Sequence, residues 1–328
     1  MRLDHAVAVI TGASSGIGRA TAHAFARRGA SVVLSSRKED ALLDLARECE
    51  LAGGQALVAA ADVTDPRAVD ELARRAVERF GRIDVWVNNA AVTMFARVPD
   101  MPLQDARRVL DVNVMGYLHG ARSALRQMRR QGSGTLINVS SLVGVVAQPY
   151  TSVYSLSKAA VRSLSGSLRG ELRLDGYRHV RVCTVLPATM DTPIFRHSAN
   201  YTGREAVPMP PVYHPQRVAR TIVNLARFPR REVVSGPLAR TILLQHKLLP
   251  GLTERMYAVQ VDKTHLSRVR PAPATSGNLY RPGTDVAVSG GWGGRRRTAQ
   301  RTVAAGAIGV AGALAARRWL RRSAPTRP

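Results

Sequence analysis

Two residues between positions 150 and 160 are spaced for acid–base chemistry. Tyr154 and Lys158 are four positions apart in a predicted helix over residues 153–175, so their side chains share one helix face. A free tyrosine phenol has a pKa of about 10, and a neighbouring ammonium favours the tyrosinate and lowers that pKa. The pair therefore predicts a phenol that gives and takes a proton near neutral pH.

Two further polar residues are placed to complete such a site. Ser141 follows a predicted strand over residues 134–139 and precedes Tyr154 by 13 positions, and its hydroxyl could stabilise charge on a substrate oxygen. Asn113 lies in a helical stretch. Each residue alone also has an ordinary interpretation: Tyr154 as an amphipathic-helix tyrosine, Ser140 or Ser141 as a cap, and Asn113 as a buried, hydrogen-bonded amide.

A glycine-rich turn connects the first predicted strand to the first predicted helix. It reads Thr11-Gly-Ala-Ser-Ser-Gly-Ile-Gly18. Glycine permits a tight turn and lets the backbone approach a pyrophosphate, and the helix that follows offers unpaired N–H groups and a positive dipole end. The turn therefore predicts a dinucleotide site with contacts from Gly12, Ser14, Ser15, Gly16, Ile17 and Gly18.

Residues at the ends of the second and third predicted strands indicate which dinucleotide binds. The second predicted strand is followed by Arg37 and Lys38, with no acid to hold a ribose 2′-OH, and cations there suit a 2′-phosphate. We expect NADP(H) rather than NAD(H); solvated charges at a helix start are the alternative. The third strand ends at Asp62-Val63, where the carboxylate could bind the adenine amino group or cap the following helix.

The elements that must position these residues alternate regularly. Predicted strands cover residues 6–11, 31–36, 55–61, 84–88, 134–139, 180–186 and 232–235, and predicted helices cover residues 17–28, 38–52, 66–80, 102–130, 153–175, 216–228 and 241–260. Apolar strands alternating with helices predict right-handed βαβ units. We expect an α/β fold with a doubly wound, Rossmann-like parallel sheet of about seven strands and helices on both faces.

Taken in order, these motifs resemble those of the single-domain branch of the short-chain dehydrogenase/reductase superfamily. The resemblance rests on the glycine turn, Asn88-Asn-Ala-Ala91, Asn113, Ser141 and Tyr154-Xaa3-Lys158, and the topology extends it to about residue 260. It implies that Tyr154 exchanges a proton with the substrate oxygen and that Lys158 also binds the nicotinamide ribose. It further implies that Asn113 holds a water molecule linking Lys158 to solvent.

The resemblance also implies cofactor contacts beyond the glycine turn, from Arg37, Asp62, Val63, Asn89, Ala90, Tyr154, Lys158, Pro187 and Thr192. Ala91 and Ala188 replace glycines of the family pattern. Ser15 stands where NADP-preferring members often carry a basic residue, so the preference for NADP(H) rests mainly on Arg37. Family members are usually oligomers, which predicts a homodimer or homotetramer.

The substrate is expected beyond the carboxyl ends of the strands, against residues 92–99, 142–150 and 188–211. The last segment is rich in Met, Tyr and Pro and could close as a lid. Its apolar side chains suggest a bulky hydrophobic carbonyl or alcohol, or they simply pack the lid onto the core.

Charge and composition argue against a nucleic-acid partner, a metal site and a signal peptide. The net charge is +25, but no zinc-finger spacing or RNA-binding aromatic signature accompanies it, so we expect no nucleic-acid partner. The two cysteines fit no metal-ligand spacing and are predicted to be reduced core residues, with no metal site. The chain enters a strand directly, so no signal peptide is expected.

The C-terminal part differs in composition. Residues 266–300 are rich in Pro, Gly and Arg and predict a linker after a catalytic domain over residues 1–265, and residues 301–328 predict an apolar helix flanked by arginines. The apolar run over residues 302–316 is short for a membrane span, which needs about 20 residues. It could lie on a membrane surface or dock on protein, so we expect a cytoplasmic protein with a possible membrane contact.

The sequence as a whole predicts an NADP(H)-dependent oxidoreductase that moves a hydride between the cofactor and a carbonyl or alcohol. The alternative is a non-catalytic NADP(H)-binding or membrane-associated scaffold on the same fold. The complete Ser141, Tyr154 and Lys158 set favours the enzyme, since a binding module has no use for it.

Overall fold

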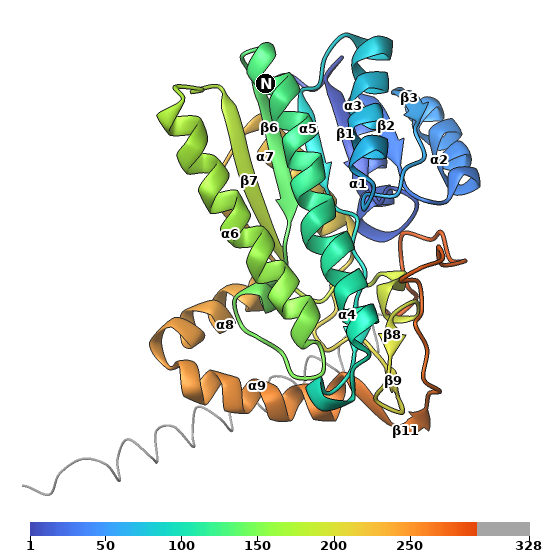
Figure 1. Ribbon diagram of the computed structural model, residues 1–328, viewed down its shortest axis with the longest axis vertical. Helices are drawn as coiled ribbons and strands as arrows, with labels where there is room; N and C mark the ends of the chain where they lie inside the picture. The colour runs from blue at the N-terminus through green and yellow to red at the C-terminus, as the bar shows by residue number, and fades with distance from the viewer. Residues whose placement is uncertain (294–328) are drawn as a thin grey trace, which may run out of the picture.

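The computed structural model describes residues 1–293 and contains a seven-stranded parallel sheet (Figure 1). Its order is β10 (Glu232–Ser235), β7 (Val180–Pro187), β6 (Gly134–Val139), β4 (Val85–Asn88), β1 (Val7–Thr11), β2 (Ser31–Ser35) and β3 (Gln55–Val58). The chain runs from β1 outward to β3 and then returns to build the other half from β4. A ligand crevice is expected at this switch point, between β1 and β4. The predicted fold class is confirmed.

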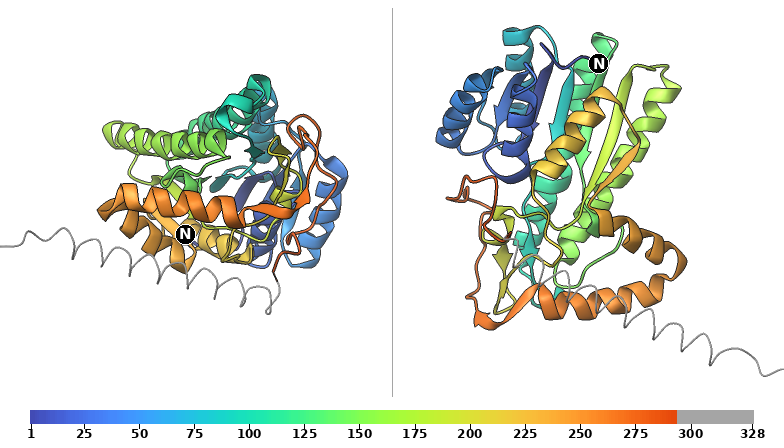
Figure 2. Two further views of the ribbon diagram at one scale, coloured as in Figure 1. Left: turned by 90° about the horizontal axis from the view of Figure 1, so that it is seen from below. Right: turned by 180° about the vertical axis from the view of Figure 1, so that it is seen from behind.

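Helices cover both faces of the sheet (Figure 2). One face carries α1 (Gly16–Ala26), α2 (Glu39–Leu51) and α7 (Gln216–Arg227), and the other carries α3 (Pro66–Phe80), α4 (Leu103–Leu110), α5 (Gly116–Arg130) and α6 (Ser152–Leu174). Strand residues alternate between the two cores: Ala8 and Ile10 face the first, Val7 and Val9 the second. Both cysteines are buried and free, as predicted.

Two predicted helices are each divided. A π-helical turn, Asp111–Met115, separates α4 from α5 within the stretch predicted as one helix over residues 102–130. The predicted helix over residues 241–260 is two helices, α8 (Pro237–Leu248) and α9 (Pro250–Thr264). Leu249 between them has φ −138° and ψ 67°, because a residue that precedes proline is kept out of the helical region.

Short strands and turns organise the end of the molecule beyond the carboxyl edge of the sheet. β5 (Met94–Phe95) pairs with β8 (Ala199–Asn200), and β9 (Arg204–Ala206) pairs with β11 (Leu266–Pro271). Single 3-10 turns are formed by Val98–Asp100, Leu142–Gly144 and Pro193–Phe195. These pairings involve too few residues to leave a period in the sequence, so they could not be predicted from hydrophobic pattern.

The stretch predicted as a linker from residue 266 differs over its first part. Residues 266–271 form β11, and residues 275–293 are hydrogen-bonded to the body of the molecule. The remainder of that stretch and the predicted helix over residues 301–328 lie outside the described residues. Within residues 1–293, no helix is both long enough and apolar enough to cross a bilayer.

Candidate active site

A cavity of about 470 Å³ opens at the carboxyl ends of the strands, at the switch point between β1 and β4. It brings together most residues predicted from the sequence: Gly12, Ser14, Ser15, Gly16, Ile17, Arg37, Asp62, Val63, Asn89, Ala90, Ser141, Tyr154, Lys158, Pro187 and Thr192. Gly18 and Asn113 are not among the lining residues. One continuous space therefore runs from the glycine turn to the Tyr154 phenol.

The glycine turn forms a backbone cradle at the start of α1. Gly12 has φ +65°, and a Cβ there would stand 2.7 Å from the Ala90 Cα. A Cβ on Gly18 would stand 2.1 Å from the Gly12 carbonyl oxygen, so Gly18 serves close packing instead of lining the cavity. Ser15, the N-cap of α1, makes no side-chain cap bond. The turn leaves a space bounded by backbone at a helix N-terminus, which suits a pyrophosphate.

The end of β4 holds this cradle in place. The Asn89 side chain donates to the carbonyl oxygens of Thr11 and Gly12 at 3.0 and 3.2 Å. The Thr11 hydroxyl accepts from the backbone N–H groups of Asn89 and Ala90 at 3.0 and 3.2 Å. On the opposite side, Gly16 lies against the methyl group of Thr192, where an added Cβ would stand 3.2 Å away. Residues from three loops thus surround one end of the cavity.

The Asp62 carboxylate is already engaged in several bonds. It accepts hydrogen bonds from the Thr64 N–H and hydroxyl at 3.0 and 2.9 Å, and Arg108 binds its other oxygen at 2.7 Å. Burial alone would raise the pKa of Asp62, but these hydrogen bonds outweigh burial and lower that pKa. Asp65, and not Asp62, is the N-cap of α3.

Tyr154 and Ser141 face the cavity from α6 and from the end of β6. Burial raises the pKa of Tyr154 to about 12, and its hydrogen bond with Ser141 acts in the opposite direction. The neighbouring Ser140 is not equivalent, because its hydroxyl donates to the Lys158 carbonyl at 2.7 Å and ties β6 to α6. The spacing argument for Ser141 over Ser140 agrees with this geometry.

Lys158 is fully buried, and its surroundings were not evident in the sequence. Its Nζ donates to the Val139 carbonyl at 3.0 Å and to the Tyr117 hydroxyl at 3.2 Å. It lies 4.8 Å above the Tyr117 ring and 5.6 Å from the centre of the Tyr154 ring. Burial lowers the pKa of Lys158 to about 7. An ammonium has three N–H donors, so one remains for a ligand.

The lowering of the Tyr154 pKa was expected from Lys158 together with the positive nicotinamide of an oxidised cofactor, and it is not found in the protein without that cofactor. Removal from water disfavours both the tyrosinate and the ammonium, and it moves the pKa of Tyr154 up and the pKa of Lys158 down. Desolvation is therefore the largest influence on both pKa values when no cofactor is bound.

Asn113 lies on the π-helical turn, and its side chain makes three hydrogen bonds. Its Oδ1 accepts from the Val92 N–H at 2.9 Å, and its Nδ2 donates to the Val92 carbonyl and to the Ser157 hydroxyl. π-helical turns are frequent at functional sites. Here the turn places the Asn113 side-chain amide within hydrogen-bonding distance of both the loop after β4 and α6. Asn113 thus connects the two walls of the cavity without contacting Lys158 directly.

The C-terminal strap, defined here as residues 275–293, covers the nucleotide end of the cavity (Figure 1, red-orange). The two terminal nitrogens of Arg37 donate to the carbonyl oxygens of Asn278 and Leu279 at 2.7 and 3.0 Å. Lys38 Nζ donates to the Thr284 carbonyl at 2.9 Å. Sequence reasoning missed the strap because its composition resembles that of a linker.

The strap is also fastened to the lid segment after β7. Both oxygens of the Asp191 carboxylate accept hydrogen bonds, from the Ser289 hydroxyl and from the N–H groups of Trp292 and Gly293. Arg196 and Asp285 form an ion pair at 3.3 Å. The lid and the strap therefore form one connected cover.

Comparison with known proteins agrees with this geometry. The family model described as short chain dehydrogenase matches residues 6–201. An uncharacterized oxidoreductase of Bacillus subtilis, YxnA, is 36% identical over 297 residues, which are 89% of this chain and 83% of the relative. A 3-oxoacyl-[acyl-carrier-protein] reductase of Thermotoga maritima, FabG, is 34% identical over 229 residues, which are 69% of this chain and 92% of the relative.

Solved structures give the same result. A short chain dehydrogenase/reductase from Burkholderia phymatum in complex with NAD has a TM-score of 0.69 and 28% identity, and the match covers 77% of this chain and 96% of that one. An alcohol dehydrogenase from Thermococcus sibiricus complexed with 5-hydroxy-NADP has a TM-score of 0.62 and 28% identity, with 70% and 95% of the two chains covered.

The fold and the site together define an oxidoreductase that uses a nicotinamide cofactor. The chain belongs to the short-chain dehydrogenase/reductase family.

Proposed function

We propose that the protein is an NADP(H)-dependent oxidoreductase that interconverts a carbonyl and an alcohol, with Tyr154 as proton donor and acceptor. One observation carries the proposal: Ser141, Tyr154 and Lys158 line the same cavity as the glycine cradle. A non-catalytic binding module or membrane scaffold would need the cradle but not these three side chains.

The residues present fit a nicotinamide dinucleotide. The cradle at Gly12 and Gly16 would hold the pyrophosphate, and Asn89, Ala90, Pro187 and Thr192 would line the path toward the nicotinamide. When bound, the cofactor supplies or accepts the hydride. The remaining N–H of Lys158 is available for a ribose hydroxyl.

Each catalytic side chain then has a distinct task in carbonyl reduction. The Ser141 hydroxyl orients the substrate oxygen and stabilises the negative charge that develops on it. Tyr154 transfers its hydroxyl proton to that oxygen, and in alcohol oxidation it takes the proton back. Lys158 stabilises the tyrosinate that remains, and Asn113 is a positioning residue that keeps the loop after β4 against α6.

Arg37 and Lys38 support a preference for NADP(H) over NAD(H). They follow β2, and residues 35–38 at this strand end carry no carboxylate to hold the 2′-hydroxyl. A guanidinium has five N–H donors, and the strap carbonyls use two from Arg37, so three remain for a 2′-phosphate. The solved relatives include one complex with NAD and one with an NADP derivative, so the choice depends on local residues such as Arg37.

The proposal extends to assembly and location. As in the family, we expect a homodimer or homotetramer, measurable by light scattering. We also propose that the basic, apolar tail over residues 301–328 contacts a membrane surface from the cytoplasm. Deleting residues 295–328 should release protein from a membrane fraction, and unchanged partitioning would reject this contact.

Replacing Tyr154 by Phe tests the central claim. Purified protein with NADPH and a panel of aldehydes, ketones and quinones should show turnover, and the variant should lose at least about 1,000-fold in kcat/KM. NADPH binding, followed by its fluorescence, should survive. Tyr177→Phe is the matched control, because that ring packs under Arg129 and does not line the cavity. Equal turnover in Tyr154→Phe and the parent would reject the mechanism.

A further inference from the structure

The cavity continues past Tyr154. Part of its wall there comes from α8 and α9, which lie outside the residues 6–201 matched by the family model. One face of α8 and one face of α9 form its wall, with Leu238, Thr241, Ile242, Gln245, Met256, Tyr257 and Gln260. These positions recur at helical spacing, so each helix turns a single stripe toward the cavity. Phe95, Phe195 and Met209 complete the enclosure.

This substrate end is uncharged among the described residues. The charged side chains that line the cavity are Lys158 at the catalytic centre and Arg37, Lys38, Asp62 and Asp285 at the nucleotide end. A carboxylate or phosphate buried beyond Tyr154 would therefore lack a counterion, which is costly in an apolar enclosure. The wall favours a neutral molecule with a largely apolar body.

One residue of this uncharged wall is a buried imidazole. His265 follows α9, lines the cavity, and packs edge-on against Phe95 and Phe195, with ring centres 5.0 and 5.5 Å apart. Its Nδ1 contacts the Val207 carbonyl oxygen. Because a carbonyl can only accept, Nδ1 carries the proton and Nε2 is left as a hydrogen-bond acceptor. Within residues 1–293, Nε2 has no hydrogen-bond partner.

His265 stays neutral over the physiological pH range. Burial lowers its pKa to about 4, against hydrogen bonds to backbone groups that would raise it. A neutral ring with a fixed tautomer accepts a hydrogen bond but does not attract an anion.

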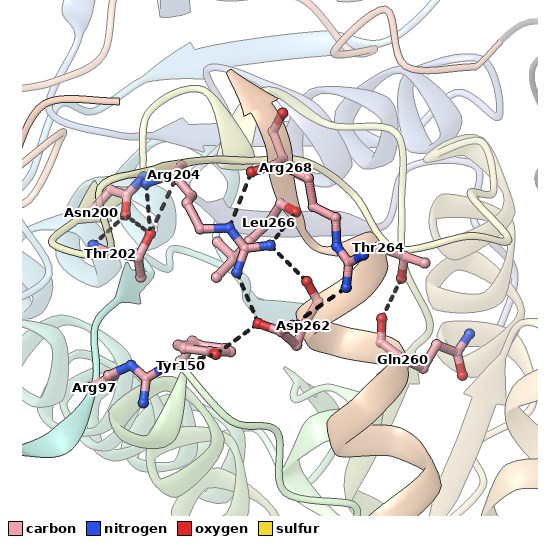
Figure 3. Close-up of polar contacts among 11 residues, drawn as sticks. Arg97, Tyr150, Asn200, Thr202, Arg204, Gln260, Asp262, Thr264, Leu266 and Arg268 are labelled. Carbon is pink, nitrogen blue, oxygen red and sulfur yellow. Dashed lines mark hydrogen bonds and ion pairs between the residues drawn. The ribbon is translucent and has the colours of Figure 1, made fainter. Parts of the chain in front are cut away.

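A clamp centred on Arg204 holds the chain on both sides of His265 (Figure 3). Arg204 donates to the Asp262 carboxylate and carbonyl at 2.8 Å, to the Leu266 carbonyl at 3.0 Å and to the Ser267 carbonyl at 3.1 Å. The Tyr150 hydroxyl donates to the same carboxylate at 2.9 Å, four residues before Tyr154. The position of the imidazole is thereby linked to the catalytic helix.

A second polar group on this wall also lacks a partner. The Thr151 hydroxyl is buried, lines the cavity, and makes no hydrogen bond within the described residues. It lies one helical turn before Tyr154. Buried polar groups are nearly always hydrogen-bonded, so this unpaired hydroxyl is unusual, but its oxygen is covered by protein atoms and does not itself reach the open part of the cavity.

We propose that the natural substrate is an uncharged, largely apolar ketone or secondary alcohol that bears a second hydroxyl, and that His265 Nε2 accepts the hydrogen bond from that hydroxyl. This assignment rests on the proposed function, since it requires the reacting oxygen to lie at Tyr154. His265 acts as a specificity-determining residue and takes no part in the proton transfer.

The test uses matched probes with NADPH: straight-chain methyl ketones of about six to ten carbons, each plain or carrying a terminal hydroxyl, methoxy or carboxylate group. At the chain length that reaches Nε2, the hydroxyl compound should exceed the plain and methoxy compounds by about 3- to 10-fold in kcat/KM. The carboxylate should be the poorest. Equal rates for hydroxyl and methoxy compounds at every length, or a carboxylate as good as the hydroxyl compound, overturn the proposal.

His265→Phe keeps the ring between Phe95 and Phe195 and removes the acceptor. It should bring the hydroxyl-to-methoxy ratio to about 1; a retained ratio contradicts the assignment. His179→Phe, at the exposed residue that precedes β7, is the control. If His265→Phe does not fold, the proposal is still tested by the kcat/KM ratios of the parent protein for the hydroxyl, methoxy and carboxylate ketones. Failure of the proposed function is distinguishable, because then no ketone is reduced at all.

Discussion

The backbone N–H of Gly16 donates a 3.0 Å hydrogen bond to the carbonyl oxygen of Ala287, which joins the first turn of α1 to the C-terminal strap. Gly16 belongs to the cradle proposed for the pyrophosphate. Asn278, Pro282, Gly283 and Asp285 of the strap line the same end of the cavity. Access to the nucleotide site is therefore shaped by a segment encoded far from the glycine turn.

Removing the strap should weaken cofactor binding. A chain ending at residue 274 keeps β11 but loses the carbonyl groups that hold Arg37 and the cover over the cavity. We expect about a tenfold higher Kd for NADPH, measured by fluorescence titration, because Arg37 must then be ordered at the moment of binding. A chain ending at residue 293 is the control and should bind like the parent. Tighter binding by the shorter chain would show that the strap competes with the cofactor.

Reversing the charge at Arg37 should change which dinucleotide is preferred. Arg37→Asp removes donors from the 2′-phosphate and adds repulsion, so the ratio of kcat/KM for NADPH to that for NADH should fall by at least about 30-fold. The ratio cancels any loss from the broken strap bonds, which affects both cofactors. Arg47→Asp, on the exposed side of α2, should leave the ratio unchanged. An unaltered ratio in Arg37→Asp would exclude this residue as the phosphate contact.

The buried ammonium should make stability depend on pH. Burial lowers the pKa of Lys158 from 10.5 to about 7, so between these values the unfolded chain binds a proton that the folded chain does not. The free energy of unfolding therefore rises with pH across this window. Relative to Lys158→Met, the cofactor-free parent should gain about 2 kcal/mol between pH 7 and pH 9, measured by urea unfolding.

Lys247→Met serves as the control for that measurement, because Lys247 is exposed on α8. Its difference from the parent should not vary with pH. If the Lys158→Met difference were equally flat, the side chain at 158 would not be desolvated as the structure shows.

Two helix glycines should respond oppositely to alanine. A Cβ on Gly120 would stand 2.1 Å from the Asn88 Oδ1, which accepts from the Trp86 indole, so Gly120→Ala should lower stability by about 2 kcal/mol or more. Gly170, exposed in α6, has nothing within 4 Å of an added Cβ. Gly170→Ala should raise stability by about 0.5–1 kcal/mol. Equal effects in thermal unfolding would contradict the close packing of α5 on β4.

Much of the architecture follows from local pattern. Buried parallel strands such as β1 and β2 are short apolar runs, and helices such as α3 begin at a proline and end at a glycine, so their existence was predictable from neighbours in the chain. The same holds for Tyr154 and Lys158, because a spacing of four places both on one helix face wherever that helix packs. The break at Leu249 was also predictable, because Pro250 keeps the preceding residue out of the helical region even though the apolar spacing continues across it.

The fold class, the glycine turn and the types of the reacting groups could therefore be predicted from the amino-acid sequence alone, because each depends on residues close together along the chain. The contacts of Tyr117 with Lys158, of Arg108 with Asp62 and of the strap carbonyls with Arg37 emerge only in the folded molecule, and so does the place of His265 in the cavity wall. The pKa values of Tyr154 and Lys158 belong to the second group as well. Desolvation is set by everything packed around a side chain, and most of those atoms come from segments distant in sequence.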